Sequence, residues 1–305
     1  MSRVAIVIVT FNSAHEIEGC LDSLTAFDDL EIVVVDNASR DRTREKVSVR
    51  SIRLIANSGN AGFAAAVNQG VRATTAPLLL LLNPDAHLER GLDALAREFD
   101  DPKTGAAGGL LTGADGAPQR GFMYRNLPSP AALIFEVLGL NRLWPGNPVN
   151  WHYRCLGRDL NTRAEVEQPA GALLMFSRVA WERVGGFDER FHPLWFEDVD
   201  FCAGLKRLGY FVHFNPLAVA RHTGSHSIRA LPLELRERYW YGSLLKYAAK
   251  NYSSQAYRVL CLAVASGAAF RAVLLAPREG WRAFAVYGAV CRLALGRLLR
   301  PGQSK

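Results

Sequence analysis

Short runs of mainly apolar residues alternate with amphipathic segments along the first hundred residues of this 305-residue chain. The runs are VAIVIVT (4–10), EIVVVD (31–36), a shorter one at 52–55, and LLLLL (78–82), each the length of one strand. A strand that is apolar at nearly every position is buried on both faces, as in a parallel sheet covered by helices. The alternation therefore predicts βαβ units and an α/β fold.

The segments between these runs have apolar residues at helical spacing or begin with residues that favour a helix start. Helices are predicted over 14–27, from Ser39 or Asp41, over 63–73 and over 88–99. Residues 112–168 are rich in Gly, Pro and Asn with isolated aromatic residues, and their pattern assigns few elements. Farther along, the pattern predicts a strand at 170–177, a helix from Arg178, a helix over 198–208, a strand at 210–214 and a loop at 221–226.

The composition limits the class of protein. Apolar residues make up 49% and charged residues 21%, as in a soluble globular domain. The five cysteines are scattered and form no CxxC pair, which argues against a disulfide framework or a structural zinc site and favours a reducing compartment. The N-terminus has no charged segment before its first apolar run, so no signal peptide is expected.

The net charge of +7 comes from the last fifty residues. Residues 255–305 hold eight Lys or Arg and the single acid Glu279, and the rest of the chain is balanced. Because these charges lie among Leu, Val, Ala and aromatic residues, the segment is typical of helices in an anionic membrane interface. The alternatives are helices packed in a core or an oligomer, and a span over 259–277 in which Arg271 reaches the headgroups. Basic residues interleaved with apolar ones do not indicate nucleic-acid binding.

Polar residues follow three of the predicted strands where each one ends. Thr10 and Asn12 follow the first strand, Asp36 ends the second, and Asn83-Pro84-Asp85 follows the five leucines. In an open parallel sheet, ligands bind outside the carboxyl ends of the strands. Since proline cannot donate to a ladder, pairing stops there and Asp85 is expected at the rim of a site. A turn without chemistry is the alternative for these three residues.

The densest polar cluster is FHPLWFEDVDF, 191–201. Glu197, Asp198 and Asp200 repel one another, and the adjacent Trp195 and Phe196 further discourage ionisation. Acids are also favoured at a helix N-terminus, so a solvated helix start is the alternative for Glu197 or Asp200.

Seven segments together carry a resemblance to a known family. They are VAIVIVTFNSAHEIEGCLDSL, EIVVVDNASRD, NSGNAGFAAAVNQG, LLLLNPDAHL, GALLMFSRVAWERVGGFDERF, WFEDVDFC and GYFVHFNPLAVARHTGSHS, in this order. Over about residues 3–228 the chain closely resembles family 2 glycosyltransferases of the GT-A fold, and among them the bacterial rhamnosyltransferase-type members. The resemblance implies a Rossmann-like, mostly parallel central sheet flanked by helices.

The resemblance also implies a domain organisation. Residues 1–228 are expected to form the catalytic domain, with a nucleotide-binding half (1–111) and an acceptor-binding half (112–228). Residues 229–305 are expected to form a helical, basic, amphipathic C-terminal region.

The family's nucleotide contacts correspond to Thr10 and Asn12 in TFN, to Asp36, and to Asn60 and Gly62. Asp36 matches the acid that hydrogen-bonds the pyrimidine ring, and a helix start near Gly62 also favours a diphosphate. For Gly62 the alternative is a glycine that only shapes a turn.

The NPD segment corresponds to the family's DxD metal element, with Asn83 in place of the first acid. That departure leaves Asp85 as the charged metal ligand and Asn83 near the nucleotide. His222, in ARHTGS, matches a histidine that several GT-A enzymes add to the metal shell. Oxygen ligands suit Mg²⁺ or Mn²⁺, and a histidine ligand favours Mn²⁺.

The ED-x-D pattern of the family makes Asp198 the catalytic base. The acceptor is expected to contact Trp195, Phe196, Glu197, Asp200, Gly171 and Ala172.

The resemblance thus predicts an inverting, metal-dependent glycosyltransferase. The expected donor is dTDP-rhamnose and the expected acceptor is a glycan or lipid-linked saccharide in bacterial cell-surface polysaccharide synthesis. The alternatives are a family 2 enzyme that uses a UDP-hexose and a non-catalytic carbohydrate- or lipid-binding scaffold. A lipid-linked acceptor and the basic C-terminal region predict a cytoplasmic protein attached to the inner face of the membrane. Linkage position and oligomeric state, a homo-oligomer included, stay open.

Overall fold

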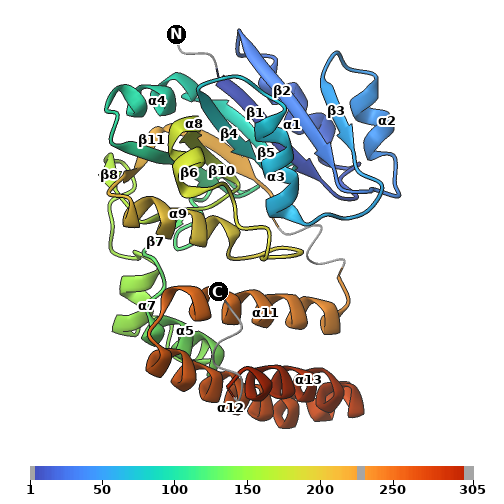
Figure 1. Cartoon of the computed structure of the whole chain (residues 1–305), viewed down its shortest axis with the longest axis vertical. Helices are drawn as coiled ribbons and strands as arrows, with labels where there is room; N and C mark the ends of the chain where they lie inside the picture. The colour runs from blue at the N-terminus through green and yellow to red at the C-terminus, as the bar shows by residue number, and fades with distance from the viewer. Residues whose placement is uncertain (1–3, 225–230, 299–305) are drawn as a thin grey trace. The chain divides into compact units, whose positions relative to one another are not determined.

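The computed structural model describes residues 4–224 and 231–298, and its contacts divide the chain into two compact units (Figure 1). The sheet unit comprises Met1–Leu127, Arg154–Pro193 and Glu197–Arg229. The helical unit comprises Pro128–Tyr153, Leu194–Phe196 and Ala230–Lys305. The predicted acceptor-binding half, 112–228, therefore contributes residues 128–153 and 194–196 to the helical unit.

The sheet unit contains a mixed sheet with strand order β3-β2-β1-β4-β10-β6-β11-β5, to which β8 adds a short edge beside β11. The first four neighbours all run parallel. These four strands are β1 (Val4–Thr10), β2 (Leu30–Asp36), β3 (Arg53–Ala56) and β4 (Leu78–Leu82). Every residue of β1 and of β4 is buried, as their continuous apolar sequences predict.

The remaining strands give the sheet its mixed character. Strand β10 runs antiparallel to both β4 and β6, and β11 runs parallel to β6 and antiparallel to β5 and β8. Their bounds are β5 (Ala86–Arg90), β6 (Thr104–Thr112), β8 (Ala164–Glu165), β10 (Leu173–Ser177) and β11 (Phe211–His222). A separate two-stranded sheet pairs β7 (Tyr124–Arg125) with β9 (Gln168–Pro169).

Helices pack on this sheet through apolar faces. They are α1 (Ile17–Leu24), α2 (Thr43–Ser48), α3 (Phe63–Arg72), α4 (Leu92–Arg97) with the 3-10 turn η1 (Glu98–Asp100), α8 (Arg178–Val184) and α9 (Glu197–Arg207). Gly70 lets α3 approach the sheet closely, because a Cβ there would lie 2.4 Å from a Val7 methyl.

The predicted α/β architecture is confirmed, and one predicted element is wrong. Residues 88–99 do not form one helix: Ala86–Arg90 pair with β11 as a strand, and the helix begins at Leu92. Gly91 separates them with φ 81°, and a Cβ there would lie 2.3 Å from the Leu217 carbonyl oxygen. Only glycine fits so close an approach at positive φ. The predicted loop at 221–226 is also shorter, because β11 continues to His222; residues 225 and 226 lie outside the described part.

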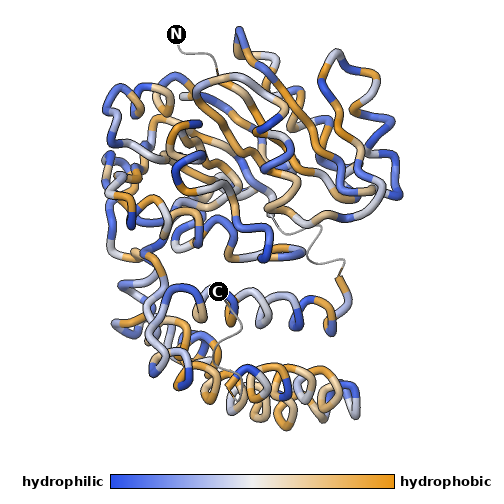
Figure 2. The backbone as a smooth tube through the Cα atoms, viewed as in Figure 1, coloured by the Kyte–Doolittle hydropathy of each residue, from blue (hydrophilic) through white to orange (hydrophobic). Residues whose placement is uncertain are grey.

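The helical unit contains α5 (Pro130–Val137), α6 (Leu140–Leu143), α7 (Pro148–Tyr153), α11 (Leu233–Asn251), α12 (Ser254–Glu279) and α13 (Trp281–Leu298). Apolar residues dominate α12 and α13 along their length (Figure 2). Arg271 of α12 donates to the Val137 carbonyl at 2.5 Å and to the Tyr241 hydroxyl at 2.7 Å, and so joins α12 to α5 and α11. All five cysteines are free.

Candidate active site

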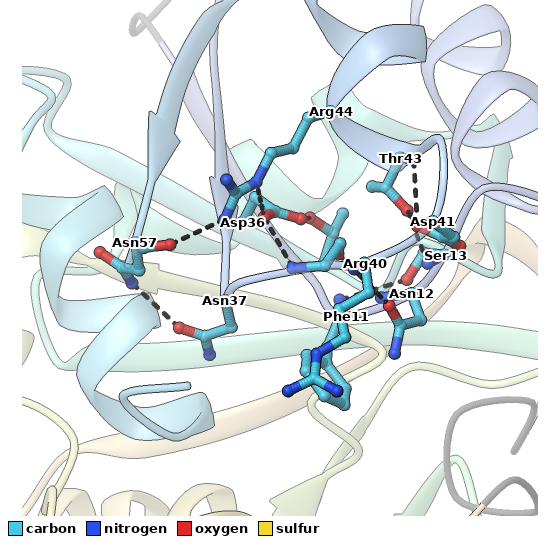
Figure 3. A network of polar contacts seen from close by, with 12 residues as sticks. Phe11, Asn12, Ser13, Asp36, Asn37, Arg40, Asp41, Thr43, Arg44 and Asn57 are labelled. Carbon is cyan, nitrogen blue, oxygen red and sulfur yellow. Dashed lines mark hydrogen bonds and ion pairs between the residues drawn. The ribbon is translucent and has the colours of Figure 1, made fainter. Parts of the chain in front are cut away.

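The carboxyl end of β2 presents Asp36, which is fully buried within a polar network (Figure 3). Its Oδ1 accepts a hydrogen bond from the Thr10 hydroxyl at 3.0 Å. Its Oδ2 accepts from the Ser39 N–H at 3.0 Å and from Arg44 Nε at 2.5 Å. Since a carboxylate offers about four acceptor positions, three are already taken. Asp36 is thereby held in one orientation at the end of the strand.

Asn12 lies at the end of β1 and belongs to the same network (Figure 3). Its backbone has φ 54°, a left-handed conformation that asparagine tolerates better than most residues. Its side-chain oxygen accepts from the Arg40 N–H at 2.8 Å, and its own N–H donates to the Ser39 hydroxyl at 2.8 Å. These bonds fix the loops after β1 and β2 to each other. The nucleotide contacts of Thr10, Asn12 and Asp36 stay predictions.

Asn60 and Gly62 form the turn that begins α3. The Asn60 side chain accepts from the Gly62 N–H at 2.9 Å, and Gly62 has φ 88°. The next N–H, that of Phe63, donates to the Pro193 carbonyl at 2.8 Å. Both of these N–H donors at the helix start are therefore used within the protein, which leaves fewer for the diphosphate that the resemblance predicts there.

The end of β4 brings Asp85 together with His222, which is 137 positions later in the chain. Pairing of β5 with β11 sets His222 opposite Ala86, and the Thr223 N–H donates to the Asp85 carbonyl at 3.1 Å. His222 Nε2 lies 3.4 Å from Asp85 Oδ1, and both residues are more than nine-tenths buried. The two predicted metal ligands are thus neighbours.

This pair has the chemistry of part of a divalent-cation site. A buried carboxylate and a buried imidazole are donors that suit Mn²⁺, and carboxylate oxygen also suits Mg²⁺. Within residues 4–224 and 231–298, no cluster of three or more His, Cys, Asp or Glu side chains is arranged to hold a metal. The pair therefore fits a cation that takes its other ligands from diphosphate oxygens and water.

Asp198 lies in the first turn of α9, where three donors hold its carboxylate. Oδ2 accepts from Gln168 Nε2 and from the Gly171 N–H, each at 3.1 Å, and Oδ1 accepts from the Val199 N–H at 2.8 Å. Burial raises the pKa of Asp198 above its ordinary value, whereas the N–H donors and the charge of Arg125 oppose that rise. An oriented carboxylate with a raised pKa is suited to accept a proton.

A short stretch of backbone joins Asp198 to the end of β4. The Gly171 N–H bonds to Asp198, and the next residue, Ala172, accepts the Asn83 N–H through its carbonyl at 3.2 Å. The carboxylate of Asp198 and the Asn83-Pro84-Asp85 segment therefore lie on the same edge of the sheet. A Cβ added to Gly171 would meet Asp198 Oδ2 at 3.5 Å, an ordinary contact, so no clash demands glycine there.

Glu197 and Asp200 flank the base and are both buried. Within the described structure, Glu197 Oε2 has no hydrogen-bond partner. Burial, and then the charge of Asp198, raise the pKa of Glu197 well above its ordinary value. A solvated helix start, the alternative considered for these residues, is therefore wrong.

Trp195 and Phe196 belong to the helical unit and both have positive φ, 74° and 70°. The Phe196 ring lies 5.5 Å from that of Tyr247, and the neighbouring Leu194 carbonyl accepts from the Ser243 hydroxyl at 2.9 Å. These contacts hold the segment against α11. The acceptor contacts predicted for Trp195, Phe196, Glu197, Asp200, Gly171 and Ala172 stay predictions.

Two glutamines complete the site and were not predicted. Gln168 donates to Asp198, and Gln119 contacts both the ring and the backbone of His222. Gln119 lies within the Gly- and Pro-rich segment, and Gln168 directly follows it. Neither has a sequence signal, because an isolated glutamine shows its partner only after folding.

The mixed sheet, with polar side chains gathered at the ends of β1, β2 and β4, defines an α/β protein of the GT-A class. Solved structures agree at the level of the fold. A mannosyltransferase from Pyrobaculum calidifontis, in complex with GDP-Man and Mn²⁺, aligns with a TM-score of 0.56 and 18% identity, covering 99% of this chain and 88% of that one. TarS of S. aureus, residues 1–349, aligns with a TM-score of 0.51 and 15% identity, covering 99% and 92%.

The sequence gives the family. Residues 5–160 match the family described as Glycosyl transferase family 2, and residues 149–300 match Glycosyl transferase family group 2. The N-acetylglucosaminyl-diphospho-decaprenol L-rhamnosyltransferase of Mycobacterium tuberculosis is 30% identical over 246 residues, 73% of this chain and 76% of the relative. The hexosyltransferase Agl10 of Haloferax volcanii is 24% identical over 212 residues, 68% of this chain and 62% of the relative. The chain belongs to glycosyltransferase family 2 and is a transferase.

Proposed function

We propose that this enzyme transfers rhamnose from dTDP-rhamnose to a hydroxyl of a lipid-linked saccharide, with inversion, during synthesis of a bacterial cell-surface polysaccharide. The observation that carries the proposal is the position of an oriented carboxylate, Asp198, on the same edge of the sheet as the Asp85–His222 pair. Asp198 can accept a proton, while a cation bound by Asp85 and His222 would hold the leaving diphosphate.

Asp198 is proposed to act as the base. As the acceptor oxygen bonds to the anomeric carbon of the donor, its proton passes to Asp198, and the bond between that carbon and the diphosphate oxygen breaks. Gln168 and the Gly171 N–H hold one carboxylate oxygen and so orient the group. A single displacement needs one base and no nucleophilic side chain, and its product has inverted configuration.

Asp85 and His222 are proposed to hold Mn²⁺ or Mg²⁺. When bound, the cation would neutralise the charge that grows on the diphosphate. Two structural neighbours were solved with Mn²⁺, which supports this choice. At 18% and 15% identity, these neighbours share the fold of this chain. Asn83 carries no charge, and we propose that it contacts the nucleotide.

The choice of donor and acceptor is supported by the 30% identical relative, whose name gives an L-rhamnosyl donor group and a diphospho-decaprenol acceptor. No residue of the site separates dTDP-rhamnose from a UDP-hexose, since Asp36 would suit thymine and uracil alike. The hexosyltransferase named among the relatives keeps the UDP-hexose alternative open.

A donor panel tests the reaction. Purified enzyme is incubated with dTDP-rhamnose, dTDP-glucose, UDP-glucose and UDP-GlcNAc, with Mn²⁺ or with EDTA, and release of the nucleoside diphosphate is measured. We expect Mn²⁺-dependent release from dTDP-rhamnose above the others. Preference for a UDP-sugar would favour the alternative enzyme, and binding of no donor would favour a non-catalytic scaffold.

A lipid-linked acceptor leads to a second proposal, that the protein works at the cytoplasmic face of the membrane. Among the described residues, α12 is the helix that is long and apolar enough to cross a membrane, a test that the core helix of a soluble protein also passes. We favour attachment over a span because Arg271, near the middle of α12, is bonded to α5 and α11.

The face of α12 that is proposed to meet the lipid is apolar, uncharged and more than half exposed. It consists of Val259, Leu262, Phe270, Val273 and Leu274. Arg258 and Arg278, both exposed, stand at its two ends. Apolar residues between cations complement an anionic lipid surface, whereas a second copy would bring arginines against arginines.

Vesicle sedimentation tests the surface. The full chain is mixed with phosphatidylcholine vesicles with or without one quarter phosphatidylglycerol, and Phe270→Glu and Val273→Glu are compared with Leu217→Glu, an exposed apolar position of the sheet unit. We expect the α12 variants to lose binding to anionic vesicles and the control to keep it. Equal sedimentation of all three would contradict attachment through α12, as would a change from dimer to monomer without a change in binding.

A further inference from the structure

Gln119 makes two hydrogen bonds to one residue, the candidate metal ligand His222. Its side-chain nitrogen donates to the His222 carbonyl at 2.7 Å, and its side-chain oxygen lies 3.0 Å from His222 Nδ1. The Phe122 ring stacks on the same imidazole, with centroids 5.4 Å apart and planes 6° from parallel. The imidazole is therefore fixed in both position and rotation.

The bond to the carbonyl determines which way the Gln119 amide points. A carbonyl oxygen only accepts, so the group facing it must be the NH₂ of Gln119. The amide oxygen then faces Nδ1 and also only accepts, so Nδ1 must carry the proton. In the neutral ring this leaves Nε2 with a free lone pair.

In the neutral Nδ1–H form, the lone pair on Nε2 faces another acceptor, Asp85 Oδ1, at 3.4 Å. Two buried acceptors that face each other are satisfied when a cation lies between or beside them. The arrangement is the one expected of a ligating histidine, whose other ring nitrogen donates to a fixed acceptor.

The backbone around Gln119 is itself held in place. Its N–H donates to the Leu111 carbonyl at 2.8 Å, and an isolated bridge pairs Thr112 with Pro118. Gln119 thus stands on a closed turn at the end of β6, beside the strand that carries His222. A rigid support of this kind allows a side-chain amide to orient a ligand.

We propose that Gln119 is a positioning residue: it sets the tautomer and rotation of His222 so that Nε2 faces Asp85 as a cation ligand, without touching the cation itself. The cation site is part of the proposed function, and the inference rests on it to that extent. The loss of such a support typically weakens metal binding about 10- to 100-fold.

Two substitutions distinguish the effect of the hydrogen bonds between Gln119 and His222 from the effect of the size of the Gln119 side chain. Gln119→Leu keeps the size and removes the acceptor, whereas Gln119→Glu keeps an oxygen that can accept from Nδ1. Mn²⁺ affinity is measured by electron paramagnetic resonance without donor or acceptor, so that turnover does not enter. We expect Gln119→Leu to weaken Mn²⁺ binding by about 10- to 100-fold and Gln119→Glu to weaken it less, since Glu keeps the acceptor for Nδ1 and loses the donor to the His222 carbonyl.

Gln168→Leu is the matched control, since it removes the glutamine that supports Asp198 instead. It should leave Mn²⁺ affinity unchanged. If Gln119→Leu binds Mn²⁺ as the wild type does while His222→Ala does not, the positioning role is wrong.

A second readout does not depend on the metal. Nitrogen-15 spectra of the histidine rings, recorded at about pH 8.5 where an ordinary histidine is neutral, report which nitrogen carries the proton. We expect the Nδ1–H form of His222 in the wild type and a mixture in Gln119→Leu. An Nε2–H form in the wild type would overturn the inference. If instead His222→Ala and Asp85→Ala both bind Mn²⁺ normally but the tautomer changes as expected, the proposed cation site fails and the orienting role of Gln119 stands.

Discussion

Two stretches of the carboxyl edge of the sheet carry buried carboxylates, and they differ in how those groups are satisfied. The stretch at the end of β2 is called the first edge, and the stretch at the end of β4 and the start of α9 is called the second edge. At the end of β2, Asp36 accepts from Thr10, Ser39 and Arg44. At the end of β4 and the start of α9, Asp85 faces a histidine and Glu197 Oε2 has no hydrogen-bond partner in the described structure. At the first edge three of about four acceptor positions of Asp36 are filled, whereas at the second edge, among the described residues, a buried carboxylate oxygen lacks a partner.

This difference distinguishes carboxylates that stabilise the fold from carboxylates that take part in the reaction. A buried carboxylate with its acceptors filled gives a rigid surface, and removing it costs stability. Buried groups whose partners are missing or of the wrong kind cost free energy to fold, and such groups mark sites where a ligand or a reaction supplies the partner. We therefore expect substitutions at the second edge to change activity more than stability, and those at the first edge to do the opposite.

The largest expected effect is that of Asp198→Asn. Asparagine keeps the shape but cannot accept a proton from the acceptor, so kcat should fall about 10²- to 10⁴-fold. The free energy of unfolding should change little, because removing a buried charge offsets the cost of an NH₂ group that faces a backbone N–H. Steady-state kinetics and urea unfolding check both, with the exposed Glu45→Gln as the control. Near-normal turnover would contradict the assignment of the base.

The wild-type pH profile tests the same group. The base works in its ionised form, and burial raises the pKa of Asp198 above the ordinary aspartate value of 3.8. Activity should therefore be complete above the raised pKa and fall about tenfold per pH unit below it. An acid limb at the ordinary aspartate value would show that burial does not control this carboxylate.

Asp85→Ala should have the next largest effect. It removes the charged ligand and leaves His222 alone, so Mn²⁺ affinity should fall on the order of 100-fold or more. Calorimetric titration with Mn²⁺ measures this directly, and excess Mn²⁺ should recover part of the activity. Unchanged affinity would show that the cation binds elsewhere or is not used.

Much of the fold could be predicted because local sequence and global burial agree in it. The runs that became β1, β2 and β4 are apolar at nearly every position, and only a strand covered on both faces satisfies them. The helix predicted over 88–99 was wrong because the periodicity of this segment also suits a helix. Pairing with β11, more than a hundred residues away, makes its first part a strand. Long-range pairing of this kind leaves no local signal.

The site could be predicted only in part, for a similar reason. The candidate acids and His222 stand beside strong patterns or in motifs, so their residue types indicated chemistry before the fold was known. Gln119 and Gln168 act through a hydrogen bond to a residue that the fold brings near them. Supporting groups of this kind are defined by geometry alone.

At the first edge, Asp36→Asn should mainly reduce stability. The neutral amide loses the charge-assisted hydrogen bond from Arg44 Nε, which costs about 1–3 kcal/mol. Chemical unfolding measures the loss, and Asp41→Asn, an exposed member of the same network, should cost less. A fall in kcat as large as that of Asp198→Asn, with stability intact, would erase the difference between the two edges.

The smallest expected effect is that of Glu197→Gln on the free energy of unfolding. It tests the second edge directly, because Glu197 is next to the proposed base Asp198. Its raised pKa means that the folded protein holds a proton that the unfolded chain releases. The stability contribution of Glu197 is therefore present below its ordinary pKa of 4.5 and is lost as pH rises towards the raised value.

Glu197→Gln mimics the protonated form, so it should raise the free energy of unfolding at neutral pH by on the order of 1 kcal/mol for each unit of pKa shift. At pH 4 the two proteins should be nearly equal. Urea unfolding at both pH values checks this. A loss of stability at neutral pH would show that Glu197 is ionised and paired, and that the second edge is as complete as the first.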